Sequence, residues 1–370
     1  MMNEEFSVKK LLFFAIYPAP YRAVLAKALA SEYQVDLFYS SCGGDDRAAE
    51  WFARGEYHAL DTQEGKTFFA QCKKKIKQYD LVVVMDFSGK EPVRLLSLCR
   101  RKKVPYLVNC DGVMLFRHGN FLRDWIKTYL LGKASAYLAS GAHAKQYFLQ
   151  YGADENKIRF HPFTSIYESD LLSAPLSPDE KAALRKNLGL PQGKLCIAVG
   201  RYIPLKRYDV LLNLWKQMPP DVHLLLIGGG PEKERYQAIL AESGLQNVIL
   251  EDFHPFGELM EYYRAADLFL HPTSYDVWGL VVNEAMANGL PVVVSDTCVA
   301  GLELIQNGKN GYVVHLGEDE EFLQKAKSIL VDDDLRASMA ESAIETIRNY
   351  TVEKMVQSQM KTVREVLSGE

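Results

Sequence analysis

Two acidic residues, Asp276 and Glu284, stand eight positions apart in the segment 266–296. This segment has the pattern of an apolar strand, a turn and a helix that begins around Gly279. The exposed N–H groups of a helix start favour a phosphate. The two carboxylates could then contact different parts of one elongated ligand. Asp276 would lie near the phosphate end, and Glu284 about a turn and a half further along the helix. A helix-capping aspartate and a solvated glutamate explain the same spacing.

A second group of polar residues, Gly200, Arg201 and Lys206, follows another apolar strand. Arg201 as a planar fork and Lys206 as a point charge could both bind a diphosphate. The run 228–230 of three glycines is a weaker phosphate-loop candidate, because it matches neither G-x-G-x-x-G nor G-x-x-x-x-G-K-[ST]. Surface cations and a tight strand-to-helix turn remain the alternative explanation.

The elements that must position these residues alternate between strand and helix along the chain. Apolar runs such as 10–17, 81–86 and 194–200 predict buried strands, and the helical stretches between them predict parallel sheets covered on both faces. The alternation breaks near residues 163–190, where Ser177-Pro178-Asp179-Glu180 predicts a capped helix start. We therefore predict an α/β protein of two doubly wound domains, with ligands at the carboxyl ends of the strands, in a cleft between facing domains.

Length and composition agree with such a protein. The 370 residues suggest about two domains. With 48% hydrophobic and 24% charged residues, the chain is not collagen-like, disordered or built on disulfides. No apolar run approaches the roughly 18 residues of a membrane span, and the first one does not resemble a signal peptide. The six scattered cysteines form no C-x-x-C pair, which argues against a zinc site and predicts a reducing, cytoplasmic location.

Charge is distributed unevenly along the chain. Residues 1–170 carry 24 Lys and Arg against 19 Asp and Glu, whereas the remainder has a net charge of −9. The basic part contains Phe121–Lys133, a Trp-bearing stretch whose pattern predicts either a solvated helix or one that lies on an anionic membrane surface. Nucleic acid is not an expected partner, because the excess is small and no recognition motif accompanies it.

The second half resembles the nucleotide-binding domain of the retaining glycosyltransferases of family 4, which have the two-domain GT-B fold. Four ordered motifs carry the resemblance over roughly residues 180–345: Gly200-Arg201 with Lys206, the loop 228–231, the run Glu284–Val292 (EAMANGLPV), and Asn307–Gly311. The segments 151–153 and 162–165 resemble bacterial members that act in surface polysaccharide synthesis. The implied domains are residues 1–170 for the acceptor, 171–345 for the nucleotide sugar, and a C-terminal helix in 346–370 that packs back on the first domain.

The resemblance implies transfer of a sugar from a nucleotide diphosphate sugar, such as a UDP-sugar, to a glycan or lipid-linked acceptor, with retention of anomeric configuration. The resemblance implies that the diphosphate is bound by Arg201, Lys206, Gly279, Leu280 and Val281. Asp276 is expected to contact the transferred sugar and Glu284 the ribose. Phe253 and His254 are expected at the nucleoside. No D-x-D pair of the kind that metal-dependent transferases use follows a predicted strand, since the run 332–334 lies in the helical C-terminal part, so we expect no metal and no cofactor besides the donor.

The chain departs from the family pattern in four places. Asp276 replaces the first glutamate, Trp278 replaces a phenylalanine, the segment 17–22 replaces a Gly-Gly loop, and Asp111 stands where many members have a histidine. Asp111 is then expected to orient the acceptor or the donor sugar, with Tyr21, Arg22 and His118 as acceptor or loop residues. These departures leave open a non-catalytic glycosyltransferase-like partner subunit as one alternative. A second alternative is a nucleotide-sugar epimerase on the same fold.

Overall fold

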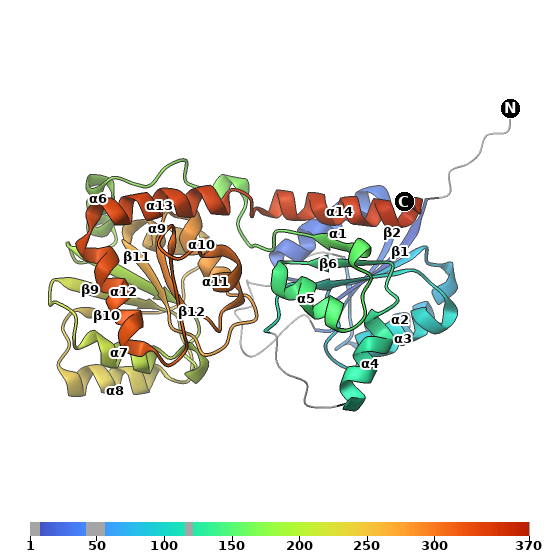
Figure 1. The fold of residues 1–370 in the computed structure, drawn as a ribbon. Helices are drawn as coiled ribbons and strands as arrows, with labels where there is room; N and C mark the ends of the chain where they lie inside the picture. The colour runs from blue at the N-terminus through green and yellow to red at the C-terminus, as the bar shows by residue number, and fades with distance from the viewer. Residues whose placement is uncertain (1–7, 42–55, 115–120, 370) are drawn as a thin grey trace. The chain divides into compact units, whose positions relative to one another are not determined.

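The computed structural model describes residues 8–41, 56–114 and 121–369, which form two compact units (Figure 1). The first unit contains the chain up to Phe163 and again from Val352 onward, and the second contains Thr164–Thr351. Each unit is built on a parallel sheet with helices packed against it. The predicted α/β class with two doubly wound sheets is confirmed.

The sheet of the first unit has, within the described residues, seven parallel strands in the order β3-β2-β1-β4-β5-β6-β7. Apolar runs such as LVVV in β4 form its centre, and all four of these residues are buried. The chain moves from one side of β1 to the other between β3 and β4, so the switch point of this sheet, where ligands bind in doubly wound folds, lies between β1 and β4. The strands are β1 (Lys10–Ala15), β2 (Gln34–Tyr39), β3 (His58–Ala59), β4 (Leu81–Val84), β5 (Tyr106–Cys110), β6 (Ala136–Ala139) and β7 (Ile158–Phe160).

Helices of the first unit include the last helix of the chain. That helix, α14, packs along α1, where Arg364 Nε donates to Glu32 Oε2 at 3.0 Å. It also reaches β7, because Arg159 Nε donates to Glu365 Oε2 at 2.8 Å. The helices are α1 (Pro20–Glu32), α2 (Gln63–Lys74), α3 (Lys90–Lys102), α4 (Phe121–Leu131), α5 (Ala142–Gln150) and α14 (Val352–Ser368).

The second unit, all of whose residues are described, has six parallel strands in the order β10-β9-β8-β11-β12-β13. Its switch point lies between β8 and β11. The strands are β8 (Lys194–Val199), β9 (Val222–Ile227), β10 (Val248–Glu251), β11 (Leu268–His271), β12 (Val292–Ser295) and β13 (Gly311–Val314). The helices are α6 (Pro178–Asn187), α7 (Tyr208–Trp215), α8 (Lys233–Ser243), α9 (Phe256–Ala265), α10 (Leu280–Ala287), α11 (Val299–Leu304), α12 (Asp319–Val331) and α13 (Asp333–Ile347), with a 3₁₀ turn η5 (Pro204–Lys206).

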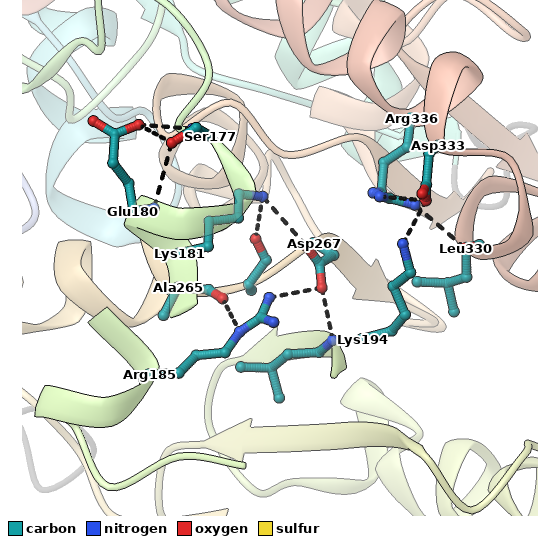
Figure 2. Close-up of polar contacts among 12 residues, drawn as sticks. Ser177, Glu180, Lys181, Arg185, Lys194, Ala265, Asp267, Leu330, Asp333 and Arg336 are labelled. Carbon is teal, nitrogen blue, oxygen red and sulfur yellow. Dashed lines mark hydrogen bonds and ion pairs between the residues drawn. The ribbon is translucent and has the colours of Figure 1, made fainter. Parts of the chain in front are cut away.

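A buried ion pair anchors α6 to this sheet (Figure 2). Asp267 accepts from Arg185 Nη2 at 2.7 Å and from the backbone N–H of Leu195 at 2.8 Å, at the amino ends of β11 and β8. Both charges of this buried pair are compensated, because Asp267 also accepts from a backbone N–H and Arg185 also donates to the carbonyl oxygen of Ala265. The capping box predicted at the start of α6 is confirmed, since Ser177 and Glu180 bond each other's backbone N–H.

Candidate functional site

Two polar loops meet at the switch point of the second unit. The loop after β8 begins at Gly200 and includes η5, and the loop after β11 leads to α10. A third loop closes on the first, since a Cβ added to Gly228, at the end of β9, would lie 2.0 Å from the carbonyl oxygen of Gly200. Gly228 also has a φ of +152°, so only glycine suits this approach. The glycine run therefore has a packing role beside the site.

Lys206 and Asp276, predicted to contact different parts of a donor, contact each other. Lys206 Nζ lies 2.6 Å from Asp276 Oδ2, and Nε2 of the fully buried His271 lies 3.1 Å from the same oxygen. Burial by itself would raise the pKa of Asp276, but the hydrogen bond from His271 and the charge of Lys206 hold that pKa well below its usual range. Asp276 is therefore ionised, and its Oδ1 accepts no hydrogen bond from a described residue.

Gly279 stands at the start of α10 with a φ of +100°. A Cβ at this position would lie 2.6 Å from the sulfur of Cys298, so a side chain does not fit. No side chain of the described residues caps this helix, which leaves its first N–H groups, those of Leu280 and Val281, suited to an anion. The nearby Trp278 is buried and donates through its Nε1 to Asn283 Oδ1 at 2.8 Å, which holds the turn in place.

Glu284 lies about one turn inside α10 and is buried. Tyr263 Oη donates to one carboxylate oxygen at 3.1 Å and Ser165 Oγ donates to the other at 3.3 Å. Burial raises the pKa of Glu284 to about 7, although both hydrogen bonds oppose the rise. This glutamate is not the solvated helix residue of the alternative explanation, because it is buried and hydrogen-bonded to Tyr263 of α9 and to Ser165.

The remaining donor-site candidates are spread along the same edge of the sheet. Arg201 follows Gly200 and is exposed. Phe253 is 61% exposed, and the ring of His254 packs against that of Tyr262 in a tilted arrangement, with 4.5 Å between ring centroids. Both residues lie beyond the end of β10. Because β9 separates β10 from β8, the base candidates lie two strands away from the Lys206–Asp276 pair.

Three of the four candidates of the first unit gather at its switch point, and His118 lies outside the described residues. Arg22 on α1 pairs with Asp111 just beyond β5, and it lies 3.8 Å from Asp86 beyond β4. Asn109 Nδ2 donates to Asp111 Oδ1 at 2.8 Å, and His161 Nε2 lies 4.0 Å from that oxygen. We name Arg22, Asp86, Asn109, Asp111 and His161 the Asp111 cluster.

Protonation in the Asp111 cluster is set by burial. Desolvation raises the pKa of Asp111 to about 6, and Arg22 opposes the rise. Desolvation lowers the pKa of His161 to about 3, so this imidazole is neutral. The third candidate, Tyr21, lies beside the cluster, with its ring below the Arg22 guanidinium at 5.5 Å. The cluster is therefore a partly buried ion pair beside a neutral imidazole.

The predicted amphipathic helix exists as α4, with its first residues exposed. Phe121 is 87% exposed, Leu122 64% and Trp125 58%, whereas Leu130 and Leu131 are buried. Lys127, a basic residue of this stretch, does not point into solvent but is half-buried, with its amine over the rings of Tyr147 and Tyr151. In the described part of the chain no helix is long and apolar enough to cross a membrane.

Sequence reasoning missed His161, His271, Tyr263 and Ser165. His161 directly follows β7 and His271 ends β11. A polar residue at the carboxyl end of an apolar strand is a usable signal, because that edge is where ligands bind in parallel sheets. Tyr263 and Ser165 offer no such signal, since they reach Glu284 only through folding.

One group of side chains resembles a metal site by proximity alone. Donor atoms of His271, Asp276 and Cys298 lie within 4.8 Å of one another. However, Lys206 already places its ammonium on Asp276 Oδ2, and burial raises the pKa of the Cys298 thiol to about 12. A cation here would have to displace the lysine and deprotonate the thiol, so the donor set does not suit one.

Comparison with known proteins finds similarity to glycosyltransferases, and the family model matches part of the second unit. Residues 180–346 match the family model of glycosyl transferases group 1. The D-inositol 3-phosphate glycosyltransferase of Xylanimonas cellulosilytica is 32% identical over 211 residues, which are 54% of this chain and 49% of that protein. Its counterpart in Acidothermus cellulolyticus is 30% identical over 61% of this chain and 52% of that protein. The chain spans about half the length of these curated relatives.

The whole chain resembles solved glycosyltransferase structures in fold. The structure of HepE from Anabaena in complex with UDP superposes with a TM-score of 0.77 at 20% identity, covering 96% of this chain and 100% of that chain. The two parallel-sheet Rossmann-like domains are those of the GT-B fold, which confirms the predicted fold.

Proposed function

We propose that this chain is a glycosyltransferase that transfers a sugar from a nucleotide diphosphate sugar to a glycan or lipid-linked acceptor. The observation that carries the proposal is the Lys206–Asp276 pair beside the uncapped start of α10, at the switch point of the unit that matches glycosyl transferases group 1. A fixed cation, open N–H groups and an ionised carboxylate suit a ligand with a diphosphate next to a hydroxylated sugar.

The leaving diphosphate is the first chemical problem. Negative charge develops on it as the bond to the sugar breaks, and donors held in place stabilise that charge without reorganisation. Arg201, Lys206 and the N–H groups of Leu280 and Val281 are proposed for this role. These cationic and backbone donors take the part of a metal ion, so we propose that the reaction needs neither metal nor cofactor.

The carboxylates are proposed to hold the sugar and the nucleoside. Oδ2 of Asp276 is engaged by Lys206 and His271, so Oδ1 is the oxygen that accepts from a hydroxyl of the transferred sugar. Glu284 accepts from the ribose hydroxyls, and the segment with Phe253 and His254 contacts the base. The pair with Lys206 compensates for the shorter aspartate, because the carboxylate is fixed in orientation before the donor binds.

Retention of anomeric configuration completes the proposed chemistry. The acceptor hydroxyl attacks from the face that the diphosphate leaves, and a phosphate oxygen takes its proton. No nucleophile from the protein is required. The family-4 resemblance of the motifs supports this step.

The first unit is proposed to bind the acceptor through the Asp111 cluster and Tyr21. A carboxylate beside a neutral imidazole can orient a hydroxyl by accepting and donating hydrogen bonds. We propose an acceptor in bacterial surface polysaccharide synthesis, with α4 resting on the inner face of the membrane through Phe121, Leu122 and Trp125, whose exposure supports such contact.

A panel of UDP-, GDP- and dTDP-sugars tests the proposal. One nucleotide series should protect the protein from thermal unfolding and be hydrolysed slowly without acceptor. Asp276→Asn should retain nucleotide binding and lose most hydrolysis. If no nucleotide sugar binds, the proposal is wrong. Binding without turnover with any acceptor would favour a non-catalytic partner subunit.

A further inference from the structure

A cavity of about 320 Å³ opens at the edge of the first unit's sheet opposite the Asp111 cluster. Pro105 precedes β5 and Ser135 precedes β6, so the cavity lies at the amino ends of these strands, whereas Asp111 follows the carboxyl end of β5. Its lining comes from the ends of α3 and α4 and the strands that follow: Cys99, Arg100, Lys103, Val104, Pro105, Tyr106, Lys133 and Ser135. The donor-site candidates belong to the other unit.

The lining has three cations and no carboxylate. Arg100 is fixed in the wall, because it donates to the carbonyl oxygen of Tyr129 and its guanidinium lies 4.0 Å from the centre of that ring. Lys103 and Lys133 form no ion pair with any described residue. The two amines therefore bring uncompensated charge to one cavity, from segments about thirty positions apart.

Lys103 holds its place in an unfavourable backbone conformation. It ends α3 with a φ of 56° and a ψ of 38°, the left-handed region in which glycine is usual at this position. Among the described residues one other non-glycine side chain, that of Arg207, stands at positive φ. Arg207 donates to Asp319 at 2.9 Å, which accounts for its side chain, whereas Lys103 has no such partner in the described part of the chain.

The dipole of α3 does not account for the arrangement. It favours cations in the last helical turn, which explains Arg100 and its two neighbours. It does not explain Lys133 and Ser135, which come from the segment after α4, nor the apolar wall that Cys99 and Tyr106 provide. A hydroxyl, two ammonium groups that form no ion pair within the described residues, and a fixed guanidinium around one cavity are the donors that a phosphate ester uses.

We propose that this cavity binds a phosphate monoester, separately from the donor site. Its volume lies at the lower end of ligand sites and suits a phosphate with a small substituent. Two sources share this chemistry, a lipid headgroup and a soluble phosphate ester. A lipid headgroup is considered because the cavity lies close to the exposed end of α4, which is proposed to contact the membrane. Arg100 lies over the ring of Tyr129, and that ring lies 5.9 Å from the ring of the exposed Trp125.

The test uses the full chain carrying Arg201→Ala and Lys206→Ala, so that the proposed diphosphate site does not bind the probe. Inorganic phosphate is titrated by calorimetry. Phosphatidylcholine vesicles with phosphatidic acid, or with phosphatidylserine at equal surface charge, are used in sedimentation. Lys103→Gly and Lys133→Ala remove the free amines, and Lys102→Ala is the charge-matched control outside the lining.

We expect saturable binding of phosphate, of phosphatidic acid vesicles, or of both, and a loss of at least about tenfold in Lys103→Gly and Lys133→Ala. Lys102→Ala should bind within about twofold of the parent, since its charge lies outside the cavity. Lys103→Gly should melt no lower than the parent, which separates lost binding from unfolding. If only inorganic phosphate binds, the ligand of the cavity is a soluble phosphate ester. If only phosphatidic acid vesicles bind, the ligand is a lipid headgroup. Absence of both, or an equal loss in Lys102→Ala, would overturn the proposal, and neither result depends on whether the second unit binds a nucleotide sugar.

Discussion

The ammonium of Lys206 lies 2.6 Å from Oδ2 of Asp276, so two residues expected to bind separate parts of a donor form an ion pair with each other. The pair is largely buried, and His271 donates to the same oxygen. The charge of Lys206 is therefore shared between Asp276 and the proposed diphosphate, and the orientation of Asp276 depends on the lysine.

Removal of the proposed diphosphate cations should lower turnover. Arg201→Ala and Lys206→Ala should each reduce kcat/KM by at least about tenfold, because one lost charge-assisted contact costs on the order of 1.5–3 kcal/mol. Lys206→Ala should also lower the free energy of unfolding, because Asp276 loses its counter-ion in a buried position. Lys186→Ala, an exposed cation of the same unit, is the control. Wild-type turnover in both site variants would refute the assignment.

The pKa of Glu284 should appear in the pH dependence of donor affinity. The ionised carboxylate is the form that accepts two ribose hydroxyls, so affinity should fall as the pH drops below about 7. Glu284→Gln should bind the donor more weakly and lose this dependence. Equilibrium titration of the protein with nucleotide, between about pH 5.5 and pH 8.5, measures the affinity and its pH dependence. This range extends roughly one and a half units on either side of the pKa of about 7. An unchanged pH profile in the variant would show that another group titrates.

Glu284 should also make stability depend on pH, with the opposite sign. Its folded-state pKa is raised from the usual 4.5 to about 7. The protonated carboxyl therefore contributes stability that is fully present below about pH 4.5 and is lost as the pH rises towards 7. Relative to Glu284→Gln, the free energy of unfolding should fall by on the order of 3 kcal/mol across this window, measured by urea titration. If the free energy of unfolding changes with pH in the same way in both proteins, the raised pKa does not belong to Glu284.

Chelation should leave activity intact. The proposed leaving-group stabilisation uses Arg201, Lys206 and backbone N–H groups, and Lys206 already neutralises Asp276. Turnover in EDTA should therefore match turnover in added Mg²⁺ or Mn²⁺. Complete loss in EDTA, restored by either metal, would show that a metal ion, and not these protein groups, stabilises the leaving diphosphate.

Replacing Arg22 alone should lower the free energy of unfolding more than replacing both Arg22 and Asp111. Arg22→Met leaves Asp111 partly buried without its main counter-ion and should lower the free energy of unfolding by about 3–5 kcal/mol. The double variant Arg22→Met/Asp111→Asn should recover part of that loss while losing transfer to the acceptor. Urea unfolding of the four proteins completes the cycle. Additive effects of the two changes would mean that the two residues are not coupled.

The exposed end of α4 should attach the protein to anionic vesicles. Trp125→Ser and Leu122→Ser should weaken sedimentation with such vesicles, and salt should weaken it further, because basic residues near the surface contribute about 1 kcal/mol each. Neutral vesicles are the control for charge. If the protein fails to sediment with any vesicle at low salt, α4 is an ordinary solvated helix and a soluble acceptor is favoured.

The local sequence determined the elements and most of the candidates at their ends. Apolar runs of strand length, such as LVVV in β4, can satisfy their burial only inside a covered parallel sheet, so the two sheets could be predicted. The capping box at Ser177 was equally predictable, because it needs only residues three positions apart. Polar residues after such strands then fall on the ligand-binding edge, which is how Arg201 and Lys206 were predicted, whereas Asp111 was predicted from the family resemblance.

Only the tertiary structure decided which of these residues contact each other. Lys206 and Asp276 are seventy positions apart and meet because β8 and β11 are neighbours, an order that no local pattern encodes. Glu284 reads as a helix residue in the sequence, and its raised pKa arises from burial beside Tyr263 and Ser165, which lie on other segments. His161 likewise reaches the Asp111 cluster through the order of strands in the sheet. Pairing and desolvation depend on distance in space, and the sequence specifies that distance only through the complete fold.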